Sequence, residues 1–189
     1  MSRRVAALVV AVATLVLVVA LVFLLRGGTR SDEASTGATE AATTSSATEP
    51  WEATLWLPSE SERLAPLAVR IESGAAVPAR GRAVIAALLA ASPGAPLDAV
   101  FPIPVRVGRL LVVDETAYVD LRPVEGGEPP PTGSRLELLR VYSVVHTLVG
   151  NVPEIGNVVL LWNGAQRQGF PGHVDTTRPL TPRSELIEQ

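Results

Sequence analysis

The sequence predicts an α+β domain, with two helices packed on one face of a mixed or antiparallel sheet, preceded by one transmembrane helix. Three observations lead to this prediction. The chain of 189 residues begins with a long apolar run. Two later segments carry apolar residues at the spacing of amphipathic helices. Around them lie short β-rich runs bounded by turn residues, which gives the order β-β-α-β-β-α-β-β.

The apolar run extends from Val5 to Leu25 and contains neither a charge nor a helix breaker. As a helix it would be about 31 Å long, close to the thickness of a bilayer core. A cleaved signal peptide is the alternative, but such peptides have a shorter apolar region and a small-residue cleavage site. Because this run ends in LLRG, we expect an uncleaved signal anchor over residues 1–26.

The charges on either side of the run predict its orientation. Arg3 and Arg4 precede it, whereas Arg26 and Arg30 follow it together with acidic residues. Positive-inside bias therefore favours a cytoplasmic N-terminus, a single pass through the inner cell membrane and an extracytoplasmic C-terminal domain. The membrane is thus the first expected partner of this chain.

Composition excludes several functional classes. The chain has no Cys, which excludes disulfides, thiolate metal ligands and a Cys nucleophile. It also has no Lys, so its 16 basic residues are all Arg. These arginines are scattered and form no basic stripe, and the formal net charge is −3. We therefore expect no nucleic-acid partner.

Residues 27–50 are predicted to be a disordered linker. The stretch GGTRSDEASTGATEAATTSSATEP has no large apolar residue, so it cannot bury enough surface to offset its ordering entropy. As a flexible coil it would reach about 27 Å. The compact domain is expected over residues 51–182, followed by a C-terminal tail over residues 183–189.

The first half of the domain is expected to contain two strands and a helix. Trp51–Leu57 alternates in polarity, which predicts a strand. Leu64–Ile71 predicts a second strand, and its Pro66 suits a sheet edge. The segment Gly81–Ser92 predicts a helix because its large apolar residues fall on one face.

Further strands are expected on either side of the second helix. Val105–Val113 and Thr116–Arg122 predict a β-hairpin, and alternation in its second strand indicates one wet face. Asn157–Trp162 predicts an apolar strand. Asn163-Gly164 is a strong two-residue turn because both positions tolerate positive φ, and Arg167–Phe170 would be the return strand.

The second helix is predicted to begin at Ser134. Glu137 follows three residues later, so the two residues match a capping box. A continuous apolar stripe then runs from Leu138 to Val149, and Gly150 ends the helix. Both predicted helices have one apolar face, so we expect them to cover one side of one sheet.

The two histidines are the main candidates for chemistry. His146 lies at the edge of the apolar face of the second helix, with Ser143 three residues earlier, but no nucleophile elbow accompanies the pair. His173 and Asp175 lack a third metal ligand at a suitable spacing. We therefore expect both histidines to be structural and Asp175 to hold a turn through backbone amides.

Other catalytic patterns are equally weak. A paired-carboxylate hydrolase would have to use Asp114, Glu115 and Asp120, which belong to a hairpin turn and an exposed strand face. No phosphate-binding or dinucleotide-binding glycine pattern occurs. We therefore predict no catalytic, cofactor-binding or metal-binding residue, no cofactor and no enzymatic activity.

Several segments of the sequence resemble the GerM domain of sporulation and spore-germination proteins. They are, in chain order, RAVIAALLAASPGAPL, VRVGRLLVVDETAYVDL, ELLRVYSVVHTL and NVVLLWNG with GHVDTTRPL. They correspond to the family's helix ending near Gly-Pro, its hairpin ending in A-Y-V-D, its second helix with YSIVNTL and its closing GGH-I/V-D-x-S-x-P-L. The resemblance covers nearly all of residues 54–180.

The resemblance implies a non-enzymatic envelope domain, similar to the ring-building modules of secretion and sporulation channels, whose core order is α-β-β-α-β. Family members in endospore formers are usually lipoproteins with two tandem domains. This chain differs from them because it has no Cys and only one predicted domain. The family offers no catalytic residues to transfer.

Three functional hypotheses follow. The anchor, linker and small domain favour a membrane-tethered interaction or assembly domain of the bacterial cell envelope, with a protein partner or a homo-oligomer. An envelope binding module for a soluble ligand or cell-wall polymer would need a cleft built from Trp51, Trp56 and Trp162. An enzyme would rest on the histidines alone. A shared concave pocket would favour the last two hypotheses, whereas a flat exposed surface would favour the first.

Overall fold

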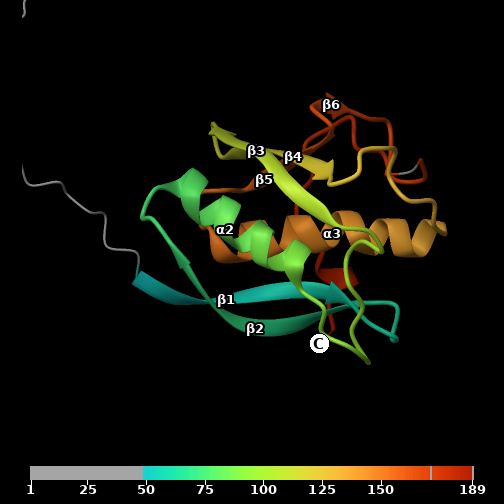
Figure 1. Ribbon diagram of the computed structural model, residues 1–189, viewed down its shortest axis with the longest axis horizontal. Helices are drawn as coiled ribbons and strands as arrows, with labels where there is room; N and C mark the ends of the chain where they lie inside the picture. The colour runs from blue at the N-terminus through green and yellow to red at the C-terminus, as the bar shows by residue number, and fades with distance from the viewer. Residues whose placement is uncertain (1–48, 171, 189) are drawn as a thin grey trace, which may run out of the picture. The chain divides into compact units, whose positions relative to one another are not determined.

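The computed structural model describes residues 49–170 and 172–188, which form an α+β domain (Figure 1). Its elements are β1 (Glu49–Pro58), β2 (Leu64–Ser73), α2 (Val77–Ala90), β3 (Val105–Val113), β4 (Thr116–Pro123), α3 (Ser134–Asn151), β5 (Asn157–Trp162), β6 (Ala165–Gln166) and the 3-10 turn η1 (Ser184–Leu186). This order confirms the predicted β-β-α-β-β-α-β-β sequence of elements. The predicted anchor at residues 1–26 and the linker up to residue 48 lie outside the described residues. None of the described helices is long and apolar enough to cross a bilayer.

The strands form two sheets, whereas the sequence predicted one. β1 and β2 make a two-stranded antiparallel sheet, in register from Glu49 opposite Ser73 to Pro58 opposite Leu64. The other strands form a mixed sheet in the order β3-β4-β5-β6, in which β4 and β5 are parallel. Figure 1 shows α2 and α3 between the two sheets. The prediction that both helices cover one face of a single sheet is therefore wrong.

Polar side chains of α3 hold β1 against the helix. Ser143, Thr147 and Asn151 recur every four residues and therefore lie along one side of α3. The Thr54 N–H donates to Asn151 Oδ1 at 2.8 Å, and the Trp56 N–H donates to Thr147 Oγ1 at 2.9 Å. Ser143 Oγ donates to the Trp56 carbonyl. Side chains four residues apart on a helix are separated by about 6 Å along its axis, and alternate residues of a strand by about 6.7 Å. The polar side chains of α3 therefore have the spacing needed to reach alternate residues of β1.

This contact explains why the domain has two sheets and why α3 is buried on more than one side. The edge of β1 that faces α3 finds its hydrogen-bond partners on a helix, so β1 and β2 do not extend the mixed sheet. Because α3 is covered from two sides, its burial is wider than the single apolar stripe that we predicted. Every residue from Leu139 to Leu148 is buried, polar ones included.

Helix α2 begins at Val77, four residues before the predicted start. Pro78 occupies its first turn, where a missing N–H costs no hydrogen bond. The helix lies close to its neighbours, since a Cβ added to Gly81 would lie 3.2 Å from side-chain atoms of both Leu110 and Leu148. It ends at Ala90 instead of the predicted Ser92. Its fully buried residues are Val84, Ile85 and Leu88.

Two tight turns shape the mixed sheet. Asp114 and Glu115 join β3 to β4 with φ of 46° and 61°. Asn163 and Gly164 join β5 to β6 with φ of 53° and 80°, which confirms the predicted two-residue turn. Such a turn places the return strand directly after Gly164, so β6 is Ala165–Gln166 and not the predicted 167–170.

The last residues belong to the domain, and the prediction of a separate tail over residues 183–189 is wrong for the part described. Leu186 in η1 is only 2% exposed. Ile187 forms a parallel bridge with Leu64, whose carbonyl accepts the Glu188 N–H at 2.9 Å. The Glu188 carboxylate accepts a hydrogen bond from the Ser59 hydroxyl at 2.6 Å. The C-terminal segment therefore packs on the β1–β2 sheet.

Candidate functional site

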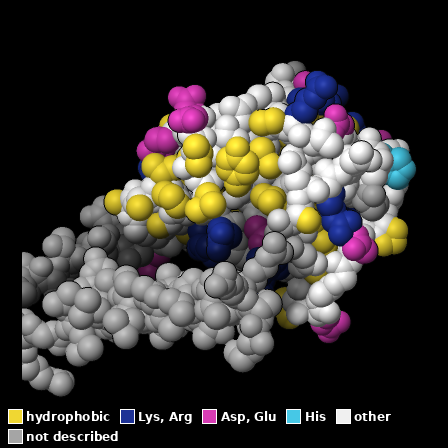
Figure 2. Space-filling view, turned by 90° about the horizontal axis from the view of Figure 1, so that it is seen from above, with side chains coloured by type: hydrophobic (Ala, Val, Ile, Leu, Met, Phe, Trp, Pro, Cys, Tyr) yellow, Lys and Arg dark blue, Asp and Glu magenta, His cyan; other side chains and the backbone are white. Residues whose placement is uncertain are grey.

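The face of the mixed sheet that points away from the helices is an exposed apolar surface. We define the outer sheet face by the outward-pointing apolar residues of its three long strands, which are Leu111, Val113, Tyr118, Val159 and Leu161. Leu111, Val113 and Tyr118 are 50%, 55% and 40% exposed, whereas Val159 on β5 is only 4% exposed. The register places Tyr118 between Leu111 and Val159. Figure 2 looks onto this side and shows hydrophobic side chains gathered across it.

Only part of this surface could be predicted from the sequence. Alternation in β4 predicted a wet outer side for the hairpin, and Tyr118 and Arg122 are indeed exposed there. The neighbouring strand β3 contains the run LLVV, which is apolar on both sides of the sheet. That run was the available signal, because a strand with one wet face normally alternates. Large exposed apolar patches mark interaction sites on soluble domains.

A shallow hollow lies at one end of the outer sheet face. It has a volume of about 280 Å³ and is lined by Arg109, Arg122 and Tyr118, among others. This volume falls just below the range of about 300–1,000 Å³ that is typical of small-molecule pockets. At this place on the sheet, the geometry therefore favours a flat contact surface over an enclosed ligand site.

The three tryptophans have separate structural roles. Trp162 is fully buried, and its ring packs against Phe101 and Phe170. Trp56 lies beside His146 with ring centroids 5.9 Å apart. The Trp51 indole N–H donates to the Ser73 hydroxyl at 3.1 Å. They therefore contact different parts of the domain and do not form the shared cleft that a binding module would need.

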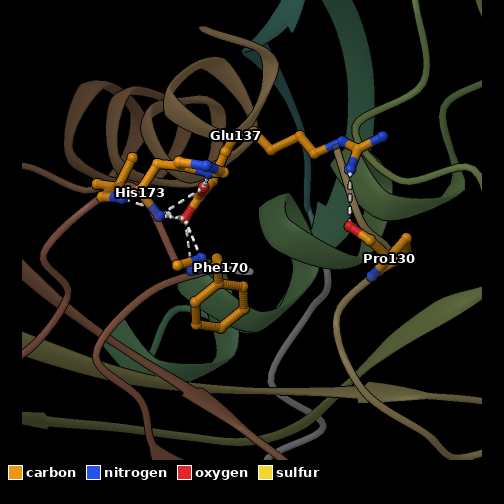
Figure 3. A network of polar contacts seen from close by, with 7 residues as sticks. Pro130, Glu137, Phe170 and His173 are labelled. Atoms are coloured by element: carbon orange, nitrogen blue, oxygen red, sulfur yellow. Dashed lines mark hydrogen bonds and ion pairs between the residues drawn. The ribbon is translucent and has the colours of Figure 1, made fainter. Parts of the chain in front are cut away.

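Glu137 is a fully buried carboxylate in the first turn of α3. The predicted capping box is wrong, because Gly133 is the N-cap and Ser134 is already helical. The Glu137 side chain instead points to the C-terminal loop, as Figure 3 shows. Its Oε1 accepts hydrogen bonds from the backbone N–H groups of Phe170 at 2.6 Å, Gly172 at 2.9 Å, His173 at 3.0 Å and Val174 at 3.2 Å.

His173 adds a side-chain contact to the same carboxylate. Its Nδ1 lies 2.7 Å from Glu137 Oε2, while the rest of the imidazole is half exposed. Burial by itself raises the pKa of Glu137, but the backbone hydrogen bonds from the loop outweigh it and lower the pKa below its ordinary value. Glu137 is therefore ionised at neutral pH and fixes the loop to the helix.

Arg140 lies one turn after Glu137 and is only 7% exposed. Burial lowers the pKa of Arg140, and the negative charge of Glu137 opposes that change. One of its terminal nitrogens donates to the Pro130 carbonyl at 3.4 Å. The arginine thus partly compensates the buried charge of Glu137.

The predicted neighbours His146 and Ser143 do not form a catalytic pair. Ser143 is bonded to the Trp56 carbonyl, whereas His146 Nε2 lies 3.0 Å from the Arg183 carbonyl oxygen and 3.1 Å from its nitrogen. His146 is 7% exposed and packs beside the Tyr142 ring. Burial lowers the pKa of His146, against smaller contributions from Arg183 and a nearby carboxylate. It is thus a buried residue, not one at the edge of the helix face.

The carboxylates of Asp175 and Asp120 also accept hydrogen bonds within the domain. Asp175 holds a turn as predicted, since its Oδ1 accepts hydrogen bonds from the Thr177 N–H at 2.9 Å and the Thr177 hydroxyl at 2.6 Å. Asp120 was expected on an exposed face but is 4% exposed, and it accepts hydrogen bonds from Arg122 Nε and the Gly164 N–H, both at 2.7 Å. In the part of the chain that the structure describes, no group of three His, Cys, Asp or Glu could hold a metal ion.

Comparisons with known proteins agree with the fold. The profile of the Germane family, described as sporulation and spore germination, matches residues 54–168. The first GerMN domain of the sporulation protein GerM from Bacillus subtilis is similar with a TM-score of 0.55 and 19% identity, over 69% of this chain and 97% of that domain. The tandem GerMN domains of that protein are similar with a TM-score of 0.53 and 17% identity, over 70% of this chain and 46% of the tandem chain. A comparison with curated proteins finds no match.

Proposed function

This chain belongs to the Germane family, and we propose that it is a membrane-tethered, non-enzymatic interaction domain of the bacterial cell envelope. The observation that carries the proposal is the outer sheet face. Leu111, Val113 and Tyr118 leave apolar side chains about half exposed on two adjacent strands. Covering such a surface releases its ordered water, which is the main driving force of protein association.

A non-enzymatic role is supported by what the buried polar groups do. Glu137 binds the backbone of the C-terminal loop, and His146 lies against the backbone of Arg183. Asp120 binds the N–H of the turn that follows β5. Each of these three buried groups thus joins segments that are distant in the chain, which is a structural role.

Tethering is proposed from the sequence alone. The apolar run Val5–Leu25 has the length of a bilayer-spanning helix, and the arginines before it favour a cytoplasmic N-terminus. We expect the full chain to stay with membranes after washing with high salt and with alkaline carbonate. We also expect the mature protein to keep residues 1–25 when its intact mass is measured. A mature N-terminus between Gly27 and Ala38 would contradict the anchor.

The interaction role is tested by photo-crosslinking in intact membranes. A photoreactive amino acid replaces Val113 on the outer sheet face of the full chain. The matched control replaces Ala68, which is exposed on β2 of the other sheet. We expect an adduct larger than the chain from position 113 and none from position 68. Equal labelling at the two positions, or none at either, would argue against a docking surface here.

The alternative is an envelope module that binds a soluble ligand or a cell-wall polymer. It draws on the hollow that Arg109, Tyr118 and Arg122 line, in which Arg122 is paired with Asp120. Equilibrium dialysis of the full chain against an anionic wall polymer separates the two roles. We expect no saturable binding there, whereas binding that Arg109→Gln abolishes would favour the alternative.

A further inference from the structure

The outer sheet face carries opposite charges at its two ends. Asp114 and Glu115 are exposed in the turn between β3 and β4, and Arg106 and Arg109 are exposed near the other end of β3. At the rise of a strand, the two ends are about 26 Å apart. Among the described residues, none of these four side chains forms an ion pair. Figure 2 shows acidic side chains beyond the left end of the hydrophobic patch and arginines along its lower and right margins.

We propose that a second copy of this chain docks on the outer sheet face, with its strands antiparallel to those of the first. This inference rests on the proposed function and names the partner. A two-fold axis that lies in the interface and runs across the strands puts the acidic turn of each copy over the arginines of the other. An axis along the strands would put like charges together, which costs binding free energy. The charges therefore select the antiparallel arrangement.

The two-fold symmetry also determines which residues contact the same residue of the other copy. Leu111 lies between the arginines and the acidic turn on β3, and Tyr118 is its neighbour on β4. The two-fold axis therefore passes near this pair, so each Tyr118 meets the Tyr118 of the other copy. Sheets that pack face to face lie about 10 Å apart, with interdigitated side chains. The half-exposed side chains of Leu111 and Tyr118 have the size to fill that space.

The area of the face predicts how tightly the copies bind. Three strands are about 14 Å wide, so the face covers about 360 Å² per copy, less than half of the roughly 800 Å² of a standard interface. The dimer is therefore weak in dilute solution. Two copies that are held in one membrane have a much higher effective concentration, which favours the contact without any added interaction.

Disulfide cross-linking of the full chain in membranes tests the arrangement. The chain has no Cys, so every disulfide reports an introduced pair. We expect Tyr118→Cys to cross-link to itself and Glu115→Cys alone to give no dimer. Co-expressed Glu115→Cys and Arg106→Cys are expected to give the mixed dimer. Self-cross-linking of Glu115→Cys, without the mixed product, would overturn the antiparallel arrangement.

Charge reversal tests the cause of the pairing. In the Tyr118→Cys background, Glu115→Arg alone or Arg106→Glu alone should lower the cross-linked yield several-fold, up to about tenfold. The two reversals together restore complementarity and should recover the yield. The matched control, Arg70→Glu on β2, should leave it unchanged. Unaltered yields in both single reversals would show that these charges do not pair the copies.

The outcomes separate this inference from the proposed function. An adduct from position 113 to a different protein, without Tyr118→Cys self-cross-linking, overturns the second-copy proposal and leaves the interaction role standing. An adduct within one chain, to residues 1–48, would show that the chain covers its own outer sheet face and would contradict both proposals. If neither the photoreactive group nor the cysteine gives a product, both proposals fail together.

Discussion

The carboxylate of Glu137 and the imidazole of His173 are 36 residues apart in the chain and 2.7 Å apart in the structure. Their contact closes the C-terminal loop onto the first turn of α3. A buried carboxylate is stable only when hydrogen bonds replace its lost water, and here backbone N–H groups of the loop do so. The loop conformation and the ionised state of Glu137 therefore depend on each other.

Glu137→Gln should destabilise the domain by about 3 kcal/mol. The substitution keeps the size of the side chain, but it removes the charge and one acceptor from a buried site that faces several N–H donors. The free energy of unfolding is measured by urea titration with tryptophan fluorescence. Glu125→Gln, at an exposed loop position, is the matched control and should change stability by less than about 0.5 kcal/mol. Equal stability of the two variants would show that the loop does not depend on the carboxylate.

Stability should fall as the pH is lowered from 7 to 5 because of His146. Burial lowers its pKa in the folded domain, so the unfolded chain binds the proton more readily. The stabilisation is fully present above the unfolded pKa of about 6.5 and is lost as the pH falls towards the folded pKa. The melting temperature, measured at several pH values, should depend less steeply on pH for His146→Phe than for the parent. Parallel slopes would mean that His146 titrates equally in both states.

Asn151→Leu should cost about 2–3 kcal/mol of unfolding free energy. Asn151 accepts the Thr54 N–H and donates to the Thr54 carbonyl, so its loss leaves two groups of β1 unpaired next to the helix. Hydrogen exchange should then show faster exchange of the Thr54 amide. Thr116→Val in β4 is the control, because its hydroxyl makes only a long contact of 3.5 Å to a turn carbonyl. An unchanged exchange rate at Thr54 would contradict the contact.

Val145→Asp should prevent stable folding, with a loss above about 4 kcal/mol. Val145 is fully buried in α3, and an aspartate there would be an unpaired charge between the two sheets. Val124→Asp makes the same change at a residue that is 61% exposed and should cost less than about 0.5 kcal/mol. Soluble yield and melting temperature separate the two variants. A Val145→Asp variant that melts like the parent would refute the assigned core.

The sequence predicted the elements well because their signals are local. The Asn163-Gly164 turn and Pro66 in an edge strand depend on the backbone of a few residues, and both occur as expected. The second sheet was not predicted, since it depends on Thr147 meeting Trp56 across 91 residues. The available signal was the polar residue at every fourth position of an otherwise apolar helix, Ser143, Thr147 and Asn151. Such a repeat indicates that the helix forms hydrogen bonds with a second neighbouring element.

Glu137 shows why the candidate site was harder to predict. A serine followed three residues later by a glutamate has the pattern of a capping box, whatever the side chain does in the fold. Only the position of the loop at residues 170–174 decides that the carboxylate turns inward. The outer sheet face could be predicted in part, because the LLVV run breaks the alternation expected of a strand with one solvent-exposed side.

Each edge of the β1–β2 sheet is partly covered by segments of the chain that come later. Side chains of α3 bind the free edge of β1, while Ile187 and Glu188 bind the start of β2 at Leu64. An open strand edge is a template on which other chains can add and aggregate. During synthesis the hairpin leaves the ribosome before α3 and before the segment that contains Ile187 and Glu188. The hairpin is therefore an unprotected template until these later segments emerge, which makes it a segment that a chaperone has reason to hold.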